Sequence, residues 1–167
     1  MSIEIRVGPA QLAIHQGHAV LLSEPDGQIQ WPSDKGLYFY DTRMISSWSI
    51  YANGCLWELL NGGATTSFAE RIFLVPRALV TEAGPVAART IGLVLSRHIG
   101  GGVHEDIDLT NYGSSKVRFN FEIAVRSDFA DIFEVKSGHF VRRGNITTEW
   151  DRKHQRLQPL RQVSSEG

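Results

Sequence analysis

The stretch KVRFNFEIAVR, Lys116–Arg126, alternates between two kinds of side chain without interruption. One set of alternate positions is apolar and consists of Val117, Phe119, Phe121, Ile123 and Val125. Polar residues and one alanine fill the positions between them. A period of two places each set on one face of an extended chain, so this stretch predicts a half-buried β-strand.

The two preceding stretches predict strands of the same kind. VHEDIDLTNYG, residues 103–113, also alternates, and turn-forming residues follow it at 111–115, which predicts a hairpin with residues 116–126. RTIGLVLSRHI, residues 89–99, is apolar and β-branched, and the glycines at 100–102 let the chain reverse after it. We therefore expect these three strands to form an antiparallel meander.

Shorter strand signals fill the first half of the chain. In MISSWSIYANGCLWELL, residues 44–60, Asn53-Gly54 separates two apolar runs, and this dipeptide readily takes the positive φ of a tight hairpin turn. Further strands are predicted in HAVLLSE (18–24), QIQW (28–31), GLYFYDTR (36–43), SFAERIFLV (67–75) and FVRRGNITTEW (140–150). No long segment has apolar residues at helical spacing. Many short strands in one chain predict an all-β fold, a single antiparallel β-sandwich.

Length and composition restrict the class of protein. The 167 residues suffice for one domain, placed at residues 1–150, and the polar residues 151–167 are interpreted as a tail or the start of a linker. With 17 basic and 18 acidic residues the net charge is -1, which argues against a nucleic-acid partner. The N-terminal residues do not resemble a secretion signal, and no segment is long and apolar enough for a membrane span. The single Cys55 fits a reducing compartment, so we expect a soluble cytoplasmic protein.

Three stretches together resemble a known family: KGLYFYDTRMISSWSIYANG (35–54), GGGVHEDIDLTNYGSSKVRFNFEIAVRSDFADIFEVK (100–136) and VRRG (141–144). Over about residues 17–144 the chain is similar to the N-terminal domain of bacterial glycogen debranching enzymes of the amylo-alpha-1,6-glucosidase type. This resemblance implies a supersandwich-like domain that precedes an α-helical toroid, in which the glycosidase acids lie. Because the chain stops at Gly167, where that toroid should begin, it also implies that this part has no catalytic residues and is inactive alone.

The stretch SDFADIFEVK, residues 127–136, carries three acids, Asp128, Asp131 and Glu134. Glycoside hydrolysis needs two carboxyl groups about 5–10 Å apart across a cleft, and a spacing of three provides no cleft. We favour a structural role, in which Asp128 and Asp131 accept backbone N–H bonds at a strand exit. The neighbouring Phe129, Ile132 and Phe133 would then anchor the turn in the core.

A second polar cluster lies in VHEDID, with His104, Glu105, Asp106 and Asp108. Alternation places the histidine and both aspartates on one face, where they could form an acid–base set like that of sugar mutarotases, or bind a divalent metal. A solvated strand face is the favoured alternative. We therefore expect no metal and no cofactor.

A third candidate surface is YFYDTR. Tyr38, Tyr40, Asp41 and Arg43 combine aromatic rings with hydrogen-bonding groups, a combination that suits either a sugar or a docking domain. Trp31 and Trp57 could extend this surface, and packing of the aromatic residues in the core is the alternative.

Three functions follow from these features. The first is a non-catalytic domain that packs on, and shapes the active site of, the helical catalytic domain of the same polypeptide in alpha-glucan metabolism. The second is a stand-alone module that binds alpha-glucan, and the third is a sugar mutarotase or epimerase that uses His104. An isolated docking face would also favour a homo-oligomer.

Overall fold

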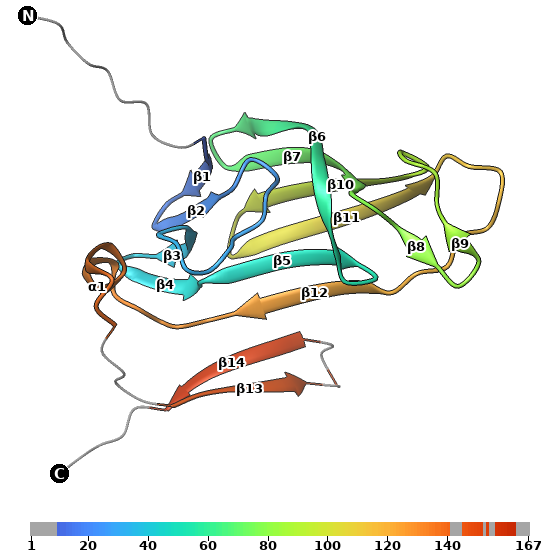
Figure 1. Ribbon diagram of the computed structural model, residues 1–167. Coiled ribbons are helices and arrows are strands. Elements are labelled where there is room, and N and C mark those ends of the chain that lie inside the picture. Colours follow the sequence, from blue (N-terminus) through green and yellow to red (C-terminus); the bar gives the residue numbers. More distant parts are fainter. Residues whose placement is uncertain (1–9, 141–144, 152, 154–155, 163–167) are drawn as a thin grey trace, which may run out of the picture.

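The computed structural model describes residues 10–140, 145–151, 153 and 156–162 (Figure 1). Four strands form one antiparallel sheet in the order β1-β2-β3-β4: β1 Leu12–Gln16, β2 Ala19–Ser23, β3 Gly36–Phe39 and β4 Thr42–Ile45. Six strands form the second sheet in the order β11-β10-β7-β6-β5-β12: β5 Ser47–Ala52, β6 Cys55–Thr66, β7 Ala69–Pro76, β10 Ile91–Ile99, β11 Val103–Asn111 and β12 Phe121–Arg126. Figure 1 shows this larger sheet curling into a half-barrel. The predicted all-β, antiparallel, sandwich-like fold is confirmed.

Three smaller elements complete the described chain. Two-stranded hairpins are formed by β8 Val80–Thr81 with β9 Gly84–Pro85, and by β13 Asn145–Asp151 with β14 Arg156–Gln162. The short helix α1 spans Ile132–Ser137. None of the helices in the described part of the chain is long and apolar enough to cross a membrane.

The four-stranded sheet is the middle layer of the domain because both of its faces are covered. On β2, Ala19 and Leu21 pack toward the six-stranded sheet, in a cluster with Ile99. The intervening Val20 and Leu22 pack toward α1. Burial of alternate residues on opposite sides follows from the period of two in a strand.

The largest core cluster lies inside the curl of the six-stranded sheet. Its members are apolar and come mainly from inward positions of successive strands: Ile50, Ala52, Trp57, Ile72, Leu74, Leu79, Ile91, Leu93 and Leu95. Removal of this much apolar surface from water is the main favourable contribution to folding. The Asn53-Gly54 turn that joins β5 to β6 has positive φ at both residues (48° and 73°), as predicted for this hairpin.

The predicted meander is only partly correct. β10 and β11 pair across the glycine turn as the meander required, but the hairpin predicted between residues 103–113 and 116–126 is wrong, because β12 pairs with β5 at the opposite edge of the sheet. Alternation determines which side chains are buried and carries no information about the partner strand. Residues 116–120, predicted as the first half of that strand, form no regular strand, and Val117 and Phe119 among them pack on the core.

Other local predictions also need correction. GLYFYDTR is two strands, β3 and β4, joined by a turn in which Tyr40 has φ 51°. QIQW forms one isolated bridge, Ile29 to Trp48, rather than a strand. In the C-terminal part, β13 contains most of the strand predicted at 140–150, and the residues interpreted as a polar tail contain β14. The segment 141–144 of the family resemblance lies outside the described residues.

Candidate functional site

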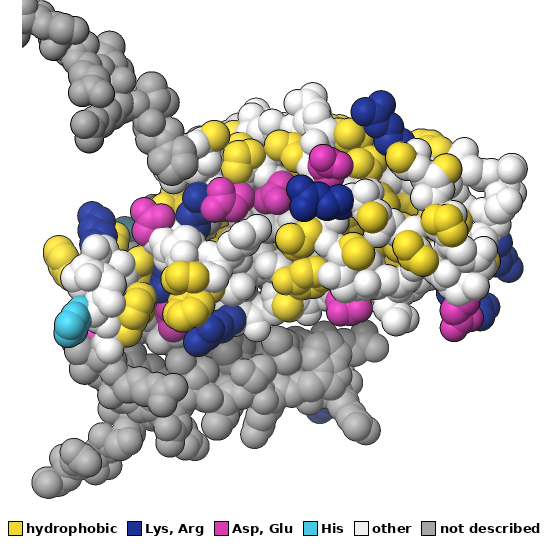
Figure 2. Space-filling view, viewed as in Figure 1, with side chains coloured by type: hydrophobic (Ala, Val, Ile, Leu, Met, Phe, Trp, Pro, Cys, Tyr) yellow, Lys and Arg dark blue, Asp and Glu magenta, His cyan; other side chains and the backbone are white. Residues whose placement is uncertain are grey.

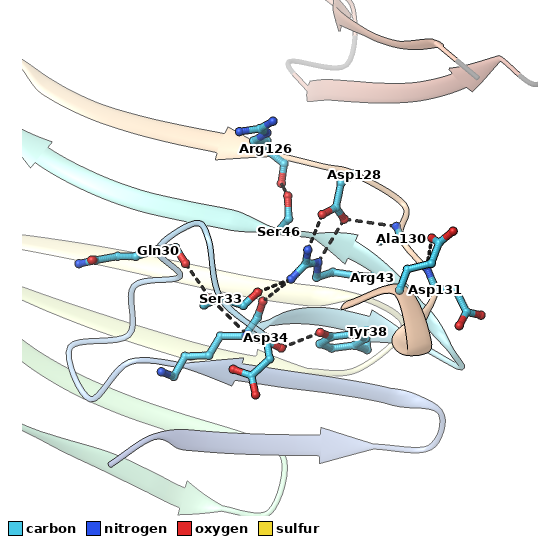
Figure 3. A network of polar contacts seen from close by, with 12 residues as sticks. Gln30, Ser33, Asp34, Tyr38, Arg43, Ser46, Arg126, Asp128, Ala130 and Asp131 are labelled. Atoms are coloured by element: carbon cyan, nitrogen blue, oxygen red, sulfur yellow. Dashed lines mark hydrogen bonds and ion pairs between the residues drawn. The ribbon is translucent and has the colours of Figure 1, made fainter. Parts of the chain in front are cut away.

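Arg43 of β4 is fully buried, at 0 % exposure, at the end of the domain that contains α1 (Figure 3). Its Nε donates to Oδ1 of Asp128 at 3.2 Å, and its Nη2 donates to Oδ2 of the same carboxylate. A two-pronged arginine–carboxylate pair of this kind fixes both direction and distance. It joins residues that are 85 positions apart in the sequence.

The same guanidinium holds the loop between β2 and β3. Its Nη1 donates to the carbonyl of Ser33 at 2.6 Å and to that of Lys35 at 3.4 Å. Tyr38 donates its hydroxyl to the carbonyl of Asp34 at 2.6 Å, and Lys35 pairs with Glu24 at 2.7 Å. Burial raises the pKa of Tyr38 above 10.0, and the positive charge of Arg43 offsets part of that rise. Buried side chains therefore donate hydrogen bonds to the carbonyls of three consecutive loop residues, Ser33, Asp34 and Lys35.

Asp128 and Asp131 shape the chain segment that faces Arg43. Asp128 accepts the N–H of Ala130 at 3.3 Å, and Asp131 accepts the N–H of Phe133 at 2.8 Å as the N-cap of α1. Glu134 accepts the N–H of Asp131 at 3.0 Å and completes a capping box. Both aspartates accept backbone N–H bonds, in line with the prediction from the sequence, but the helix was not predicted, although the spacing of Asp131 and Glu134 could have indicated it.

The expectation that Phe133 anchors this turn in the core is wrong, because its side chain is 74 % exposed. The core contacts come from Ala130 and Val135, with Ile132 partly buried beside them. A capped helix turns its apolar side chains to different sides, and here Phe133 faces solvent.

Five exposed rings gather at this end of the molecule, and we call them the aromatic end: His18, Phe39, Tyr40, Phe133 and Phe140. His18 stacks on Tyr40 with centroids 4.2 Å apart, and Phe39 meets Tyr40 edge-on at 4.9 Å. The other two rings belong to neighbouring segments, since the N–H of Ile132, the residue before Phe133, donates to the carbonyl of Asp41 at 2.8 Å, and the Cζ atom of Arg43 lies 5.7 Å from the Phe140 centroid. Figure 2 shows apolar side chains at this end of the visible face.

The structure divides the residues of the predicted aromatic surface. Tyr38 and Arg43 are buried, whereas Tyr40 and Asp41 are exposed because the turn at Tyr40 ends the alternation. Arg43 pairs with Asp128. Trp57 is a core residue at 3 % exposure, so its predicted place on the surface is wrong.

Trp31 is the second large exposed aromatic side chain of the predicted surface, at 47 % exposure. The Cζ atom of Arg126, from the end of β12, lies 4.6 Å from its ring centroid. Ser46 donates to the carbonyl of the same Arg126 and ties the start of β5 to this strand. One face of the indole is therefore occupied by a guanidinium.

The second predicted cluster is split between the two faces of β11. His104 and Asp106 lie on the outer face, with Nε2 and Oδ1 3.2 Å apart and side chains 62 % and 64 % exposed. Asp108 is also exposed. Glu105 points to the opposite face, into the half-barrel, and so it does not belong to the cluster.

The partner of Glu105 is Arg97 of β10, which the sequence analysis missed. Arg97 donates to Glu105 at 2.7 Å, to Glu70 of β7 at 2.7 Å, and to the carbonyl of Gly27 at 3.1 Å. Burial raises the pKa of both carboxyl groups, and Arg97 opposes that rise. The signal was available, because Arg97 occupies an inward position of the alternation, between Leu95 and Ile99.

Neither the His104 cluster nor the Arg97 cluster contains three side chains placed to bind one metal ion. Within the described ranges, no group of three or more His, Cys, Asp or Glu side chains could hold a metal ion.

A groove of about 430 Å³ lies at the other end of the domain, between the β8–β9 hairpin and residues 113–117, and none of the predicted site residues lines it.

Comparison with known proteins identifies the kind of domain to which this geometry belongs. A family model described as the N-terminal domain of some glycogen debranching enzymes matches residues 14–162. The matched range contains both large sheets except for the first two residues of β1, together with the Arg43 contacts and the aromatic end. A search of curated proteins found no match.

Proposed function

Because this chain belongs to the family of N-terminal domains of some glycogen debranching enzymes, we propose that it is a non-catalytic β-sandwich that packs on a helical toroid glycosidase domain and shapes its active site. The parent enzyme would hydrolyse alpha-1,6 linkages in alpha-glucan. The partner would be the C-terminal helical domain of the same polypeptide.

The observation that carries this proposal is the aromatic end and the way in which it is held. Aromatic side chains are enriched at protein interfaces relative to the rest of the surface. Beneath them, the buried Arg43 side chain fixes the 31–35 loop and the turn at Asp128 by hydrogen bonds to both. A surface that is ordered before binding loses less entropy on docking, so this end suits a permanent partner.

Three of the acids singled out in the sequence support a non-catalytic role because each of the three has a structural partner. Asp128 pairs with Arg43, Asp131 caps α1, and Glu105 pairs with Arg97. A general acid must instead be free to deliver its proton to a substrate oxygen.

Titration with a separately purified helical domain of a debranching enzyme from this family tests the proposal. We expect saturable binding that Tyr40→Ala or Phe133→Ala weakens by tenfold or more, measured by calorimetry. Tyr112→Ala is the matched control, because Tyr112 is 71 % exposed and its N–H donates to the carbonyl of Thr90, which lines the groove beside the β8–β9 hairpin, away from α1. Equal weakening by all three variants, or no binding by the unmodified chain, would contradict the proposal.

A stand-alone glucan-binding module is the second candidate, and the stacked pair of His18 and Tyr40 favours it. Sugar rings stack on aromatic faces through their C–H groups. Calorimetry of the chain with maltoheptaose and with a branched glucan separates the two candidates, since only the binding module should release heat that Tyr40→Ala abolishes.

The mutarotase or epimerase candidate would depend on His104 and Asp106, which lie on an open strand face rather than in a cleft. A His104→Ala protein with full activity would eliminate that role.

The exposed rings would also drive self-association of the isolated chain, which light scattering after size-exclusion chromatography would detect.

A further inference from the structure

We propose that His98 and His104 together bind one divalent transition-metal ion, such as Zn²⁺, on the outer face of the six-stranded sheet, with Asp106 orienting His104. This site is independent of the aromatic end and of the proposed function. It would tie the edge strand β11 to β10.

The backbone holds the two histidines in fixed relative positions. His98 of β10 is directly opposite His104 of β11, in the last pair but one before the turn. Nine consecutive residue pairs set this register, and the N–H of Gly100 closes the turn on the carbonyl of Gly102 at 2.8 Å. Ligands carried by paired strands are ordered before the metal arrives, which favours binding.

The distance between the two rings fits a shared metal ion. Their centroids are 5.0 Å apart and their planes are inclined by 40°. A metal at about 2.0–2.1 Å from one nitrogen of each ring, in near-tetrahedral geometry, separates the centroids by about 5 Å. The neighbour of His98 on β7 is the small Ala69, so the side of the pair away from β11 is not crowded.

Asp106 supplies the group that orients a histidine ligand. Its Oδ1 lies 3.2 Å from Nε2 of His104, so with a proton on Nε2 the bond leaves Nδ1 of that ring with a lone pair for the metal. Metal-binding histidines usually donate their second N–H to a carboxylate or carbonyl in this way. Imidazole nitrogens prefer Zn²⁺, Ni²⁺ or Cu²⁺ to Mg²⁺ or Ca²⁺, which sets the class of ion. Water would complete the coordination, because two protein ligands leave positions open.

Titration of the full chain with Zn²⁺ at pH 7.5, followed by calorimetry, tests the site. We expect one equivalent to bind, and His98→Ala and His104→Ala each to lower the affinity by at least tenfold. Asp106→Ala should lower it by about tenfold. Asp108→Ala is the matched control, since it removes the same charge from the same face two residues further along β11, and it should change the affinity by less than twofold.

Circular dichroism confirms that each variant keeps its fold, which is expected because the substituted side chains are exposed. Loss of binding in folded His98→Ala and His104→Ala proteins supports the site. No binding by the unmodified chain at millimolar Zn²⁺ overturns it, and so does binding that either histidine variant retains in full. Equal losses for Asp106→Ala and Asp108→Ala would overturn the orienting role of Asp106.

Discussion

Two buried arginines anchor this domain in different ways. Arg43 has one carboxylate partner, Asp128, and its other bonds go to backbone carbonyls of a loop. Arg97 lies between two carboxylates, Glu70 and Glu105, so its cluster has one negative charge in excess when both are ionised.

The two clusters also differ in what they join. The partners of Arg97 lie on β7 and β11, directly opposite Arg97 in the register of one sheet, so the backbone already holds them together. The partners of Arg43 lie on a loop and on the turn after β12, which only side-chain and bridge contacts bring to β4. We infer that Arg97 determines how the interior of the half-barrel is filled, whereas Arg43 determines the shape of the aromatic end.

The largest effect is expected for Arg97→Met. The substitution leaves two carboxyl groups buried without a cation, and breaking a buried ion pair on one side costs about 3–5 kcal/mol. Urea unfolding should therefore show a loss of about 4–5 kcal/mol in the free energy of unfolding. Arg71→Met, at an exposed position of β7, is the control and should change it by less than about 0.5 kcal/mol. A loss below about 1 kcal/mol for Arg97→Met would contradict the importance of the cluster.

Arg43→Met should cost less, about 2–3 kcal/mol, because the Asp128 side chain is 19 % exposed and can regain water. Its distinguishing effect should be local. Hydrogen exchange of the Ile132 and Ala130 amides should accelerate much more than that of the β10 amides. Asp128→Asn, which keeps an acceptor for the guanidinium, should lose less stability than Arg43→Met. Uniform acceleration over the whole domain would remove the distinction between the two arginines.

The excess negative charge beside Arg97 predicts a dependence on pH. Burial raises the pKa of Glu70 above 4.5, so the folded state holds the proton more tightly than the unfolded state. The contribution of Glu70 to the free energy of unfolding is therefore lost as the pH rises from about 4.5 through the pKa of the folded state. Each tenfold gain in the proton affinity of Glu70 on folding contributes about 1.4 kcal/mol to that loss. The unfolding free energy of the unmodified protein, minus that of Glu70→Gln, should fall as the pH rises above about 4.5. A difference that rises with pH would mean that Arg97 outweighs burial.

The smallest effect is expected for Asp131→Ala, which removes the N-cap of α1. Loss of such a cap costs about 1 kcal/mol. Because α1 covers one face of the four-stranded sheet through Val135, we expect this cost to appear as faster exchange in α1, with β10 unaffected. Lys136→Ala, a change at an exposed position of the same helix, is the control. An unchanged α1 in Asp131→Ala would show that the helix is held by packing alone.

Much of the candidate site could not be predicted from the sequence. The residue types of Tyr38, Arg43 and Asp128 singled them out, but no local rule relates positions 43 and 128. The turn at Tyr40 was also missed, because a continuous apolar and aromatic run looks like one strand whether or not it reverses. In contrast, the burial of Arg97 follows from its inward position in an alternating strand and was open to prediction.

Local sequence signals were sufficient for the all-β class, the Asn53-Gly54 hairpin and the pairing of β10 with β11, because side-chain alternation and turn chemistry act between near neighbours in the chain. Long-range packing was needed to bring β12 to β5, to join Arg43 to Asp128, and to bury Tyr38 while Tyr40 stays exposed. These outcomes depend on which apolar faces can be covered together, and that choice is made by the whole fold rather than by any one segment.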